Sequence, residues 1–269
     1  VPSAVWQWEP LPLMVGKRVR AAAGVVRGQI YICGGFTEEL STTAVVERFD
    51  TGLGAWETVP PMQWARDTPS AGVLDGKLYV CGGWSRSGEA LRSLECFDPD
   101  VAAWEELRPM QEPRAKLVTC ALGSDRGFYA CGGCTGEWCL SSAERFDIVS
   151  GEWRSLASMQ QRRVDASAVA LGGRVYVCAG KPSLALFLSS VERYDPTEDR
   201  WEALAPMSTA RSSAAATVIA GILVVFGGIG EGCDVLQSVE AFDPERSAWV
   251  ALPPLPEKRC CATAVCTSG

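Results

Sequence analysis

The stretch that decides the fold is YICGGF, residues Tyr31–Phe36, an apolar segment that ends in two glycines and an aromatic residue. It recurs as YVCGGW, Tyr79–Trp84, and as YACGGC, Tyr129–Cys134. A tryptophan recurs with nearly the same period, 48 or 49 residues, at Trp8, Trp56, Trp104, Trp153, Trp201 and Trp249. A period of this length indicates that the chain is built from repeated supersecondary units.

Two further landmarks keep this period. A glutamate, followed by any residue, an aromatic residue and aspartate, stands at Glu47, Glu95, Glu144, Glu192 and Glu240. An arginine ends the turn after each tryptophan, at Arg66, Arg114, Arg163, Arg211 and Arg259. Arg18 stands in the same register, although Arg20 competes with it. Because every repeat carries them, we interpret the tryptophans and glutamates as residues that hold the scaffold together.

Each repeat is predicted to be a four-stranded antiparallel sheet. In residues 66–107, the segments SAGVL and KLYVCGG flank Asp75–Gly76, which is a strong hairpin signal. The segments SLECFD and AAWEEL supply two more strands. The first strand of each repeat is rich in small side chains, which suits the crowded axis of a radial β structure.

These landmarks resemble those of Kelch-repeat proteins across nearly all 269 residues. The resemblance implies an all-β Kelch β-propeller with four-stranded antiparallel blades, one blade for each repeat. The turns of the type PM…R are most similar to those of the BTB–Kelch adaptors, which present substrates to cullin-type ubiquitin ligases. The chain contains no BTB or BACK region, so its residues support the propeller and not the adaptor role.

We predict one propeller domain over residues 1–269, with five complete repeats at about 18–59, 66–107, 114–156, 163–204 and 211–252. Residues 1–9 and 259–269 carry the tryptophan and arginine landmarks of a sixth blade, of which two strands are missing. We therefore expect a six-blade ring with an incomplete sixth blade, and roughly 30 further residues upstream in the native chain. The rival is a five-blade ring with two accessory terminal strands.

Composition argues against several classes of function. The net charge of −7 opposes general binding to nucleic acid or to anionic membranes, and no apolar run approaches the length of a membrane span. The absence of histidine removes the commonest metal ligand and general base. We therefore expect no enzyme, metal site or cofactor.

The chain has twelve cysteines, of which Cys33, Cys81, Cys131 and Cys178 repeat at one position inside apolar strands. This pattern indicates buried thiols and a reducing compartment, the cytoplasm or the nucleus. In the stretch CGGCTGEWC, Cys131, Cys134 and Cys139 lack a fourth ligand and any histidine for a zinc site. A redox pair of Cys134 and Cys139 lacks an activating basic neighbour, so we interpret the three as one core cysteine and two loop cysteines.

Function is expected where the repeats differ, in the loops after the glycine pairs and in the turns before the arginines. In the resembled propellers these loops share the face that binds partners. Aromatic residues there are typical of binding hot spots, and the arginines of the turns can hold carboxylates bidentately. Packing of neighbouring loops and of the scaffold explains the same residues equally well. The candidate partner-binding residues are Phe36, Trp64, Arg66, Trp84, Arg86, Arg114, Trp138, Arg163, Lys181, Arg211 and Arg259.

The sequence therefore predicts a non-enzymatic module that binds a protein or an acidic peptide through the loop face. Substrate recognition for a cullin-type ubiquitin ligase is one form of this hypothesis. Two alternatives stay open, a structural or scaffold subunit of a large assembly and an enzyme with a carboxylate-lined channel.

Overall fold

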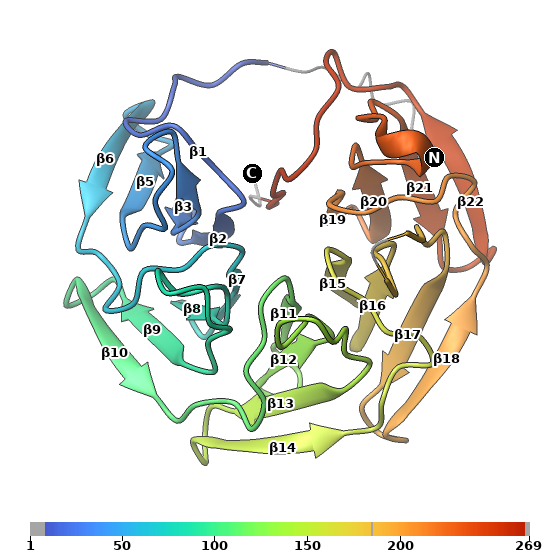
Figure 1. Ribbon diagram of the computed structural model, residues 1–269, viewed down its shortest axis with the longest axis horizontal. Coiled ribbons are helices and arrows are strands. Elements are labelled where there is room, and N and C mark those ends of the chain that lie inside the picture. The colour runs from blue at the N-terminus through green and yellow to red at the C-terminus, as the bar shows by residue number, and fades with distance from the viewer. Residues whose placement is uncertain (1–8, 184, 267–269) are drawn as a thin grey trace.

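Four-stranded antiparallel sheets are arranged radially around a central axis in the computed structural model, which describes residues 9–183 and 185–266 (Figure 1). The described residues form five such sheets, and within each the chain runs as a meander from the innermost to the outermost strand. The all-β propeller with four-stranded blades that the repeats predict is confirmed.

The first three blades follow one another along the chain. The first contains β2 (Ala22–Val26), β3 (Gln29–Cys33), β5 (Val46–Asp50) and β6 (Ala55–Val59). The second contains β7 (Ser70–Leu74), β8 (Lys77–Cys81), β9 (Leu94–Asp98) and β10 (Ala103–Leu107). The third contains β11 (Val118–Leu122), β12 (Gly127–Cys131), β13 (Ala143–Asp147) and β14 (Glu152–Leu156).

Two more blades complete the regular part of the ring. The fourth contains β15 (Ser167–Leu171), β16 (Arg174–Cys178), β17 (Val191–Asp195) and β18 (Arg200–Leu204). The fifth contains β19 (Ala215–Ile219), β20 (Ile222–Phe226), β21 (Val239–Asp243) and β22 (Ala248–Leu252). A short ladder joins β1 (Arg18–Val19) to β4 (Phe36–Thr37), and the 3-10 turn η1 spans Glu231–Cys233.

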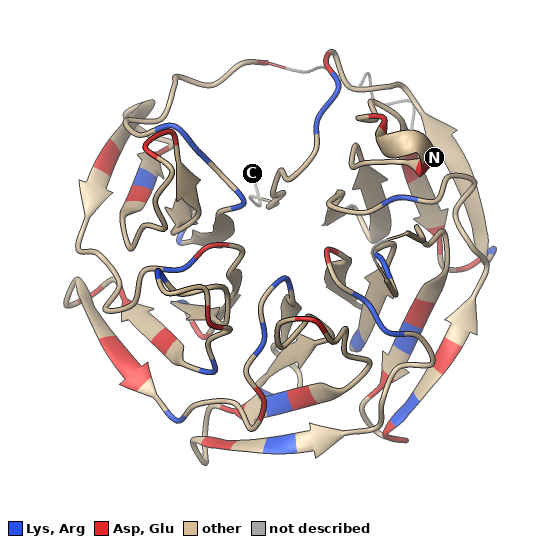
Figure 2. Ribbon diagram, in the orientation of Figure 1, with Lys and Arg blue, Asp and Glu red and all other residues tan. Residues whose placement is uncertain are grey.

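The core lies between successive blades. The inner strands β2, β7, β11, β15 and β19 contact one another in that order, and they carry no charged residue (Figure 2). Gly72 in β7 shows why they are rich in small residues, since a Cβ there would lie 2.9 Å from the Phe128 ring of the next blade. Farther out, larger apolar side chains fill the space, such as Leu78 and Phe97 against Tyr31. Each blade thus buries its apolar face only because a neighbour stacks on it.

The recurring tryptophans tie each blade to the linker before it. Trp104 stacks on Phe97 of its own blade, with ring centroids 5.1 Å apart, and its indole N–H donates to the Pro60 carbonyl at 2.8 Å. Trp56, Trp153, Trp201 and Trp249 repeat the hydrogen bond with equivalent carbonyls. Their interpretation as scaffold residues is confirmed.

The first and fifth sheets are separated by a sector of the ring (Figure 1). Residues 9–17 and 253–266 cross it without forming a strand. Residues 253–266 nevertheless begin like the linkers between the other blades. Gly228 N donates to Arg259 O at 2.8 Å, as Gly180 N does to Arg211 O in the preceding blade. Of the strands expected from the termini, the one at 259–266 is not formed, and residues 1–8 lie outside the described part. The incomplete sixth blade therefore stays a prediction.

The described residues include no helix with the length and apolar character that a membrane crossing requires.

Candidate functional site

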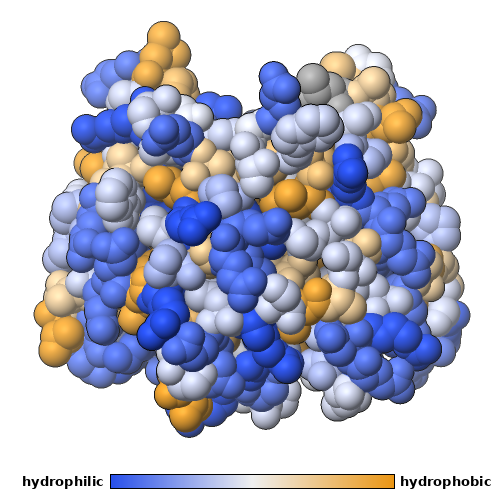
Figure 3. Space-filling model, turned by 60° about the horizontal axis from the view of Figure 1, so that its bottom comes forward, coloured by the Kyte–Doolittle hydropathy of each residue, from blue (hydrophilic) through white to orange (hydrophobic). Residues whose placement is uncertain are grey.

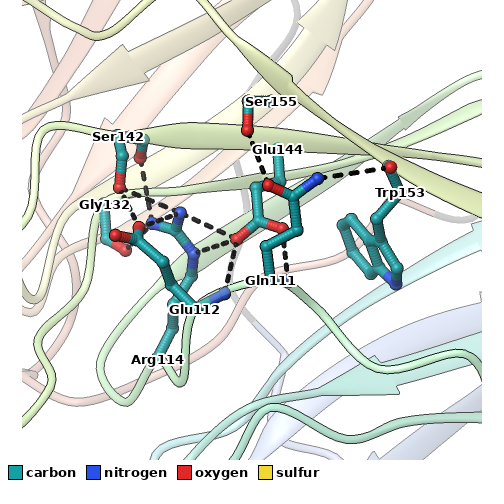
Figure 4. Close-up of polar contacts among 8 residues, drawn as sticks. All are labelled: Gln111, Glu112, Arg114, Gly132, Ser142, Glu144, Trp153 and Ser155. Atoms are coloured by element: carbon teal, nitrogen blue, oxygen red, sulfur yellow. Dashed lines mark hydrogen bonds and ion pairs between the residues drawn. The ribbon is translucent and has the colours of Figure 1, made fainter.

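The arginines that end the turns lie inside the scaffold, and the prediction that they grip a partner is wrong for four of them. Arg66, Arg114, Arg163 and Arg211 are at most 1% exposed. Arg114 Nη2 lies 2.9 Å from Glu144 Oε1 and 2.9 Å from Ser142 Oγ, and Nη1 donates to the carbonyls of Gly132 and Ser142 (Figure 4). Arg114 Nε also donates to Glu144 Oε1, at 3.1 Å, so none of the five guanidinium N–H groups is left for a ligand.

Most of these contacts recur around the ring, although Arg211 Nε has no hydrogen-bond partner among the described residues. The other three ion pairs join Arg66 to Glu95, Arg163 to Glu192 and Arg211 to Glu240. Arg18 pairs with Glu47, so Arg18 rather than Arg20 keeps the register. Each glutamate also accepts backbone N–H groups of the turn, as Glu144 does from Gln111 and Glu112. The turn is therefore fastened to the blade that it enters, which explains why every repeat keeps both residues.

The two variable loop sets do lie on one face, because they pair with each other. In each of the five blades, the residue after the arginine forms a β-bridge with the residue after the glycine pair, or after Ala179–Gly180 in the fourth blade. In the second blade, Asp67 N donates to Trp84 O at 2.9 Å and Trp84 N to Asp67 O at 2.7 Å. The glycines permit this approach, since a Cβ at Gly83 would lie 2.7 Å from Asp67 O. The varying residue that ends each CGGx-type stretch is thus held in the loop face by backbone hydrogen bonds, half-buried at Phe36, Trp84, Lys181 and Ile229 and buried at Cys134.

A groove on this loop face is the candidate site. Its volume is about 780 Å³, and it runs over the loops of the second, third and fourth blades. Trp84 lines it and is half-buried against Ala115, Cys134 and Val164. Trp138 also lines it, on the tip of the third blade's loop, and is 69% exposed. The two indoles give one concave site a wide apolar surface.

The charge of the groove is mainly positive. Lys116 and Arg162 contribute to its lining, together with the single acidic residue Glu137. Lys116 Nζ lies 3.7 Å from Asp165 Oδ2, a loose ion pair. Arg162 is exposed and forms no ion pair within the described part of the chain. Because charge-assisted hydrogen bonds to a guanidinium are among the strongest polar contacts, Arg162 is suited to hold a carboxylate.

The other predicted aromatic residues lie elsewhere. Trp64 is 45% exposed, but its indole N–H reaches Glu106 on the outer strand β10, at 3.3 Å. Phe36 is half-buried, and the guanidinium carbon of Arg20 lies over its ring, 4.9 Å from the ring centroid. The structure therefore brings Trp84 and Trp138 together and leaves Phe36 and Trp64 outside the groove.

The remaining predicted residues have local partners. Arg86 is exposed and its Nε donates to Thr42 O of the first blade at 3.3 Å. The Lys181 ammonium lies 4.5 Å from the centroid of the Phe187 ring. Arg259 is exposed and contacts only Glu257 among the described ion pairs, at 3.4 Å. None of these three side chains lines the groove.

The central channel is narrow and lined mainly by small residues. Its inner cavity of about 180 Å³ is bounded by the inner strands and by residues 262–264, and an adjoining cavity adds Arg20, Lys116 and Asp165 to the described lining residues. The described part of the chain contains no cluster of three or more cysteine or acidic side chains placed to hold a metal ion. On the face drawn in Figure 3, hydrophobic side chains form small separate groups among hydrophilic ones.

Lys116 and Arg162 are the groove residues that the sequence reasoning missed. A signal for Lys116 exists, because the residue two places after each arginine differs in every repeat: Arg20, Thr68, Lys116, Asp165, Ser213 and Cys261. All six have a positive φ, between 51° and 59°. A position with constant backbone conformation and changing side chain is where a repeat scaffold varies its surface.

Comparisons with known proteins agree with this architecture. The model of the KLHDC2/KLHL20/DRC7 Kelch-repeats domain matches residues 6–180, and the Kelch motif matches residues 162–208 and 210–256. The search of curated proteins gave no match. Among solved structures, the one titled "Structure of YjhT" superposes with a TM-score of 0.76 at 14% identity, over 89% of this chain and 85% of that chain, which shows a shared fold. The chain belongs to the KLHDC2/KLHL20/DRC7 Kelch-repeats domain family.

Proposed function

We propose that this Kelch propeller is a non-enzymatic protein-interaction module whose binding site is the groove over the second to fourth blades. Its occupant is an extended segment of a partner protein that carries an aromatic or aliphatic side chain close to a carboxylate. The observation that carries the proposal is the exposed Trp138 beside Trp84 in a concave site that also contains Arg162.

Apolar contact supplies the larger share of the binding free energy in this proposal. Tryptophan and arginine are the residues most enriched among interface hot spots, and burial of their surface under a ligand removes water from both partners. The volume of about 780 Å³ lies in the range of pockets that enclose a few side chains, and it is too small for a folded domain.

The charge of the groove selects the kind of segment. The whole chain carries a net charge of −7, so long-range steering does not favour an acidic partner. An acidic segment gains only from short-range contacts, which Arg162 and Lys116 offer at the groove. We infer that the carboxylate is fixed by Arg162 and that the neighbouring side chain packs on the indoles.

The alternatives receive less support. An enzyme with a carboxylate-lined channel gains little from a channel whose described lining contains one carboxylate, that of Asp165, beside the cations of Arg20 and Lys116. A scaffold subunit would use a larger and flatter surface than this groove. Recognition of substrates for a cullin-type ubiquitin ligase is a finer form of the proposal, and co-purification of the full-length native protein with a cullin tests it.

A peptide library displayed on phage tests the proposal without knowledge of the native partner. Selection on the intact propeller is expected to enrich sequences that combine an acidic residue with an aromatic or large aliphatic residue. These peptides should lose binding to the variants Trp138→Ala and Arg162→Glu. Val149→Ala is the matched control, because Val149 is an exposed apolar residue in the β13–β14 turn, at the opposite end of the strands. Failure to enrich any sequence, or enriched peptides that bind all variants equally, would overturn the proposal.

A further inference from the structure

Cys134 and Cys139 face each other across a β-bridge in the loop after β12. Thr135 N donates to Trp138 O at 3.2 Å and Leu140 N donates to Gly133 O at 2.8 Å, which are the bonds on either side of the pair. The two cysteines therefore form a non-hydrogen-bonded antiparallel pair, the type in which opposite side chains approach most closely. Such a pair has Cα atoms about 4.5 Å apart, inside the range of Cα separations that a disulfide spans.

The same bridge recurs in other blades with residues that cannot be oxidised in this way. It pairs Phe36 with Thr42, Trp84 with Ala90 and Ile229 with Val235. Each has the same pattern of flanking bonds, for example Ser85 N to Glu89 O and Leu91 N to Gly83 O around the second pair. The backbone geometry is therefore imposed by the scaffold, and only the third blade places a thiol on both sides.

We infer that Cys134 and Cys139 are a redox-modifiable dithiol, which a low-molecular-weight disulfide such as oxidised glutathione converts to an intramolecular disulfide. This inference goes beyond the proposed function and does not depend on it. It replaces our interpretation of the two residues as plain loop cysteines. Both thiols are free in the structure.

Exposure sets the order of the steps. Cys139 is partly exposed and Cys134 is buried, so an oxidant reaches the Cys139 sulfur first. The Cys139 thiolate attacks one sulfur of the oxidant, a mixed disulfide forms, and one glutathione thiolate leaves. The Cys134 sulfur then attacks the Cys139 sulfur, the protein disulfide forms, and the second glutathione thiolate leaves. Two cysteine thiols are oxidised, two glutathione thiols are produced, and their protons pass from the cysteines to the leaving thiolates.

Burial favours the thiol form in the resting state. Desolvation raises the pKa of Cys134, so its thiolate is scarce near neutral pH and the second step is the slower one. The product would close a ring over Thr135, Gly136, Glu137 and Trp138, and it would fix the loop that presents Trp138.

Disulfide mapping tests this inference. The folded protein is incubated with oxidised glutathione, free thiols are alkylated, and the chain is cleaved after glutamate, which cuts at Glu137 between the two cysteines. A covalently linked pair of fragments on either side of Glu137 is expected, and dithiothreitol should separate them. Cys120 and Cys131 are the other cysteines of the fragment before Glu137, and both are buried, in β11 and in β12. The variants Cys120→Ala and Cys131→Ala should each keep the link, and Cys139→Ala should lose it.

A link that survives in Cys131→Ala and disappears in Cys139→Ala supports the inference. Glutathione retained on Cys139 as a mixed disulfide, a link that needs Cys131, or no reaction by a natively folded protein would overturn it. The circular dichroism spectrum of each variant reports whether its propeller is folded.

Discussion

Arg114 Nη2 lies 2.9 Å from Glu144 Oε1, and neither side chain is more than 2% exposed. Arg114 belongs to the turn that enters the third blade, and Glu144 lies on β13 of the same blade (Figure 4). The pair is completed by backbone donors and acceptors, so a full ionic unit is buried without an orphaned charge. Its repetition makes the turn arginines part of the scaffold and leaves recognition to residues beside them.

The variant Arg114→Met should lower the free energy of unfolding by about 3–5 kcal/mol, because it leaves the buried Glu144 carboxylate without its counter-charge. Urea denaturation measures the loss. Arg259→Met is the matched control, since Arg259 is exposed and has only a loose contact with Glu257, and its effect should stay below about 1 kcal/mol. The double variant Arg114→Met, Glu144→Leu should recover part of the loss. Equal effects of Arg114→Met and Arg259→Met would refute the structural role.

The lowered pKa of the buried Glu240 leads us to predict that the stability of the protein depends on pH. Burial acts to raise the pKa of its carboxyl group, but hydrogen bonds from Ser208 and the Arg211 charge prevail and hold the pKa below its ordinary value of 4.5. The unfolded state therefore binds the proton more readily, so the stabilisation is present above pH 4.5 and is lost as the pH falls through the lower folded pKa. Glu240→Gln should be less stable at neutral pH and should flatten the fall in melting temperature below pH 4.5. A fall as steep as that of the wild type would contradict this assignment.

The glycine pairs provide a steric prediction. Gly82 has φ +64°, and a Cβ there would lie 2.3 Å from Arg114 O. Gly88 has φ +81°, but a Cβ there would meet nothing within 4 Å. Gly88→Ala should therefore cost only the backbone strain of about 1 kcal/mol, whereas Gly82→Ala should cost clearly more and displace the turn. Thermal unfolding of the two variants compares them, and similar melting temperatures would mean that the close approach is not required.

The sequence predicted the repeat, the strand order and the scaffold role of the tryptophans, because these features recur in every blade and obey simple periodic rules. The sequence did not decide whether the turn arginines are exposed to a partner or buried in the scaffold. An arginine that follows a turn is compatible with a solvent-exposed ring or with a buried ion pair, and only the position of Glu144 opposite Arg114 decides between them. The sequence shows that each arginine is followed by a glutamate about 30 residues later. Whether the two side chains meet depends on how the strands pair, which the spacing alone does not show.

The candidate groove could be predicted only in part. Trp84 and Trp138 are distinguishable in the sequence because they are tryptophans outside the repeated positions. Arg162 directly precedes the repeated Arg163, and no pattern in the sequence distinguishes it from the rest of the turn. The separation of Trp64 from the groove depends on its contact with Glu106 in the outermost strand, a tertiary relation that no local pattern contains.

The affinity of a library-selected acidic peptide for the variant Trp138→Ala tests the central claim most directly. Isothermal titration calorimetry at constant salt compares it with the wild type and with Val149→Ala. We expect the loss of a hot-spot indole to cost at least about 2 kcal/mol, which is roughly a 30-fold rise in Kd, and we expect Val149→Ala to bind as the wild type does. An unchanged Kd for a folded Trp138→Ala, or an equal loss in both variants, would contradict the assignment of the groove as the binding site.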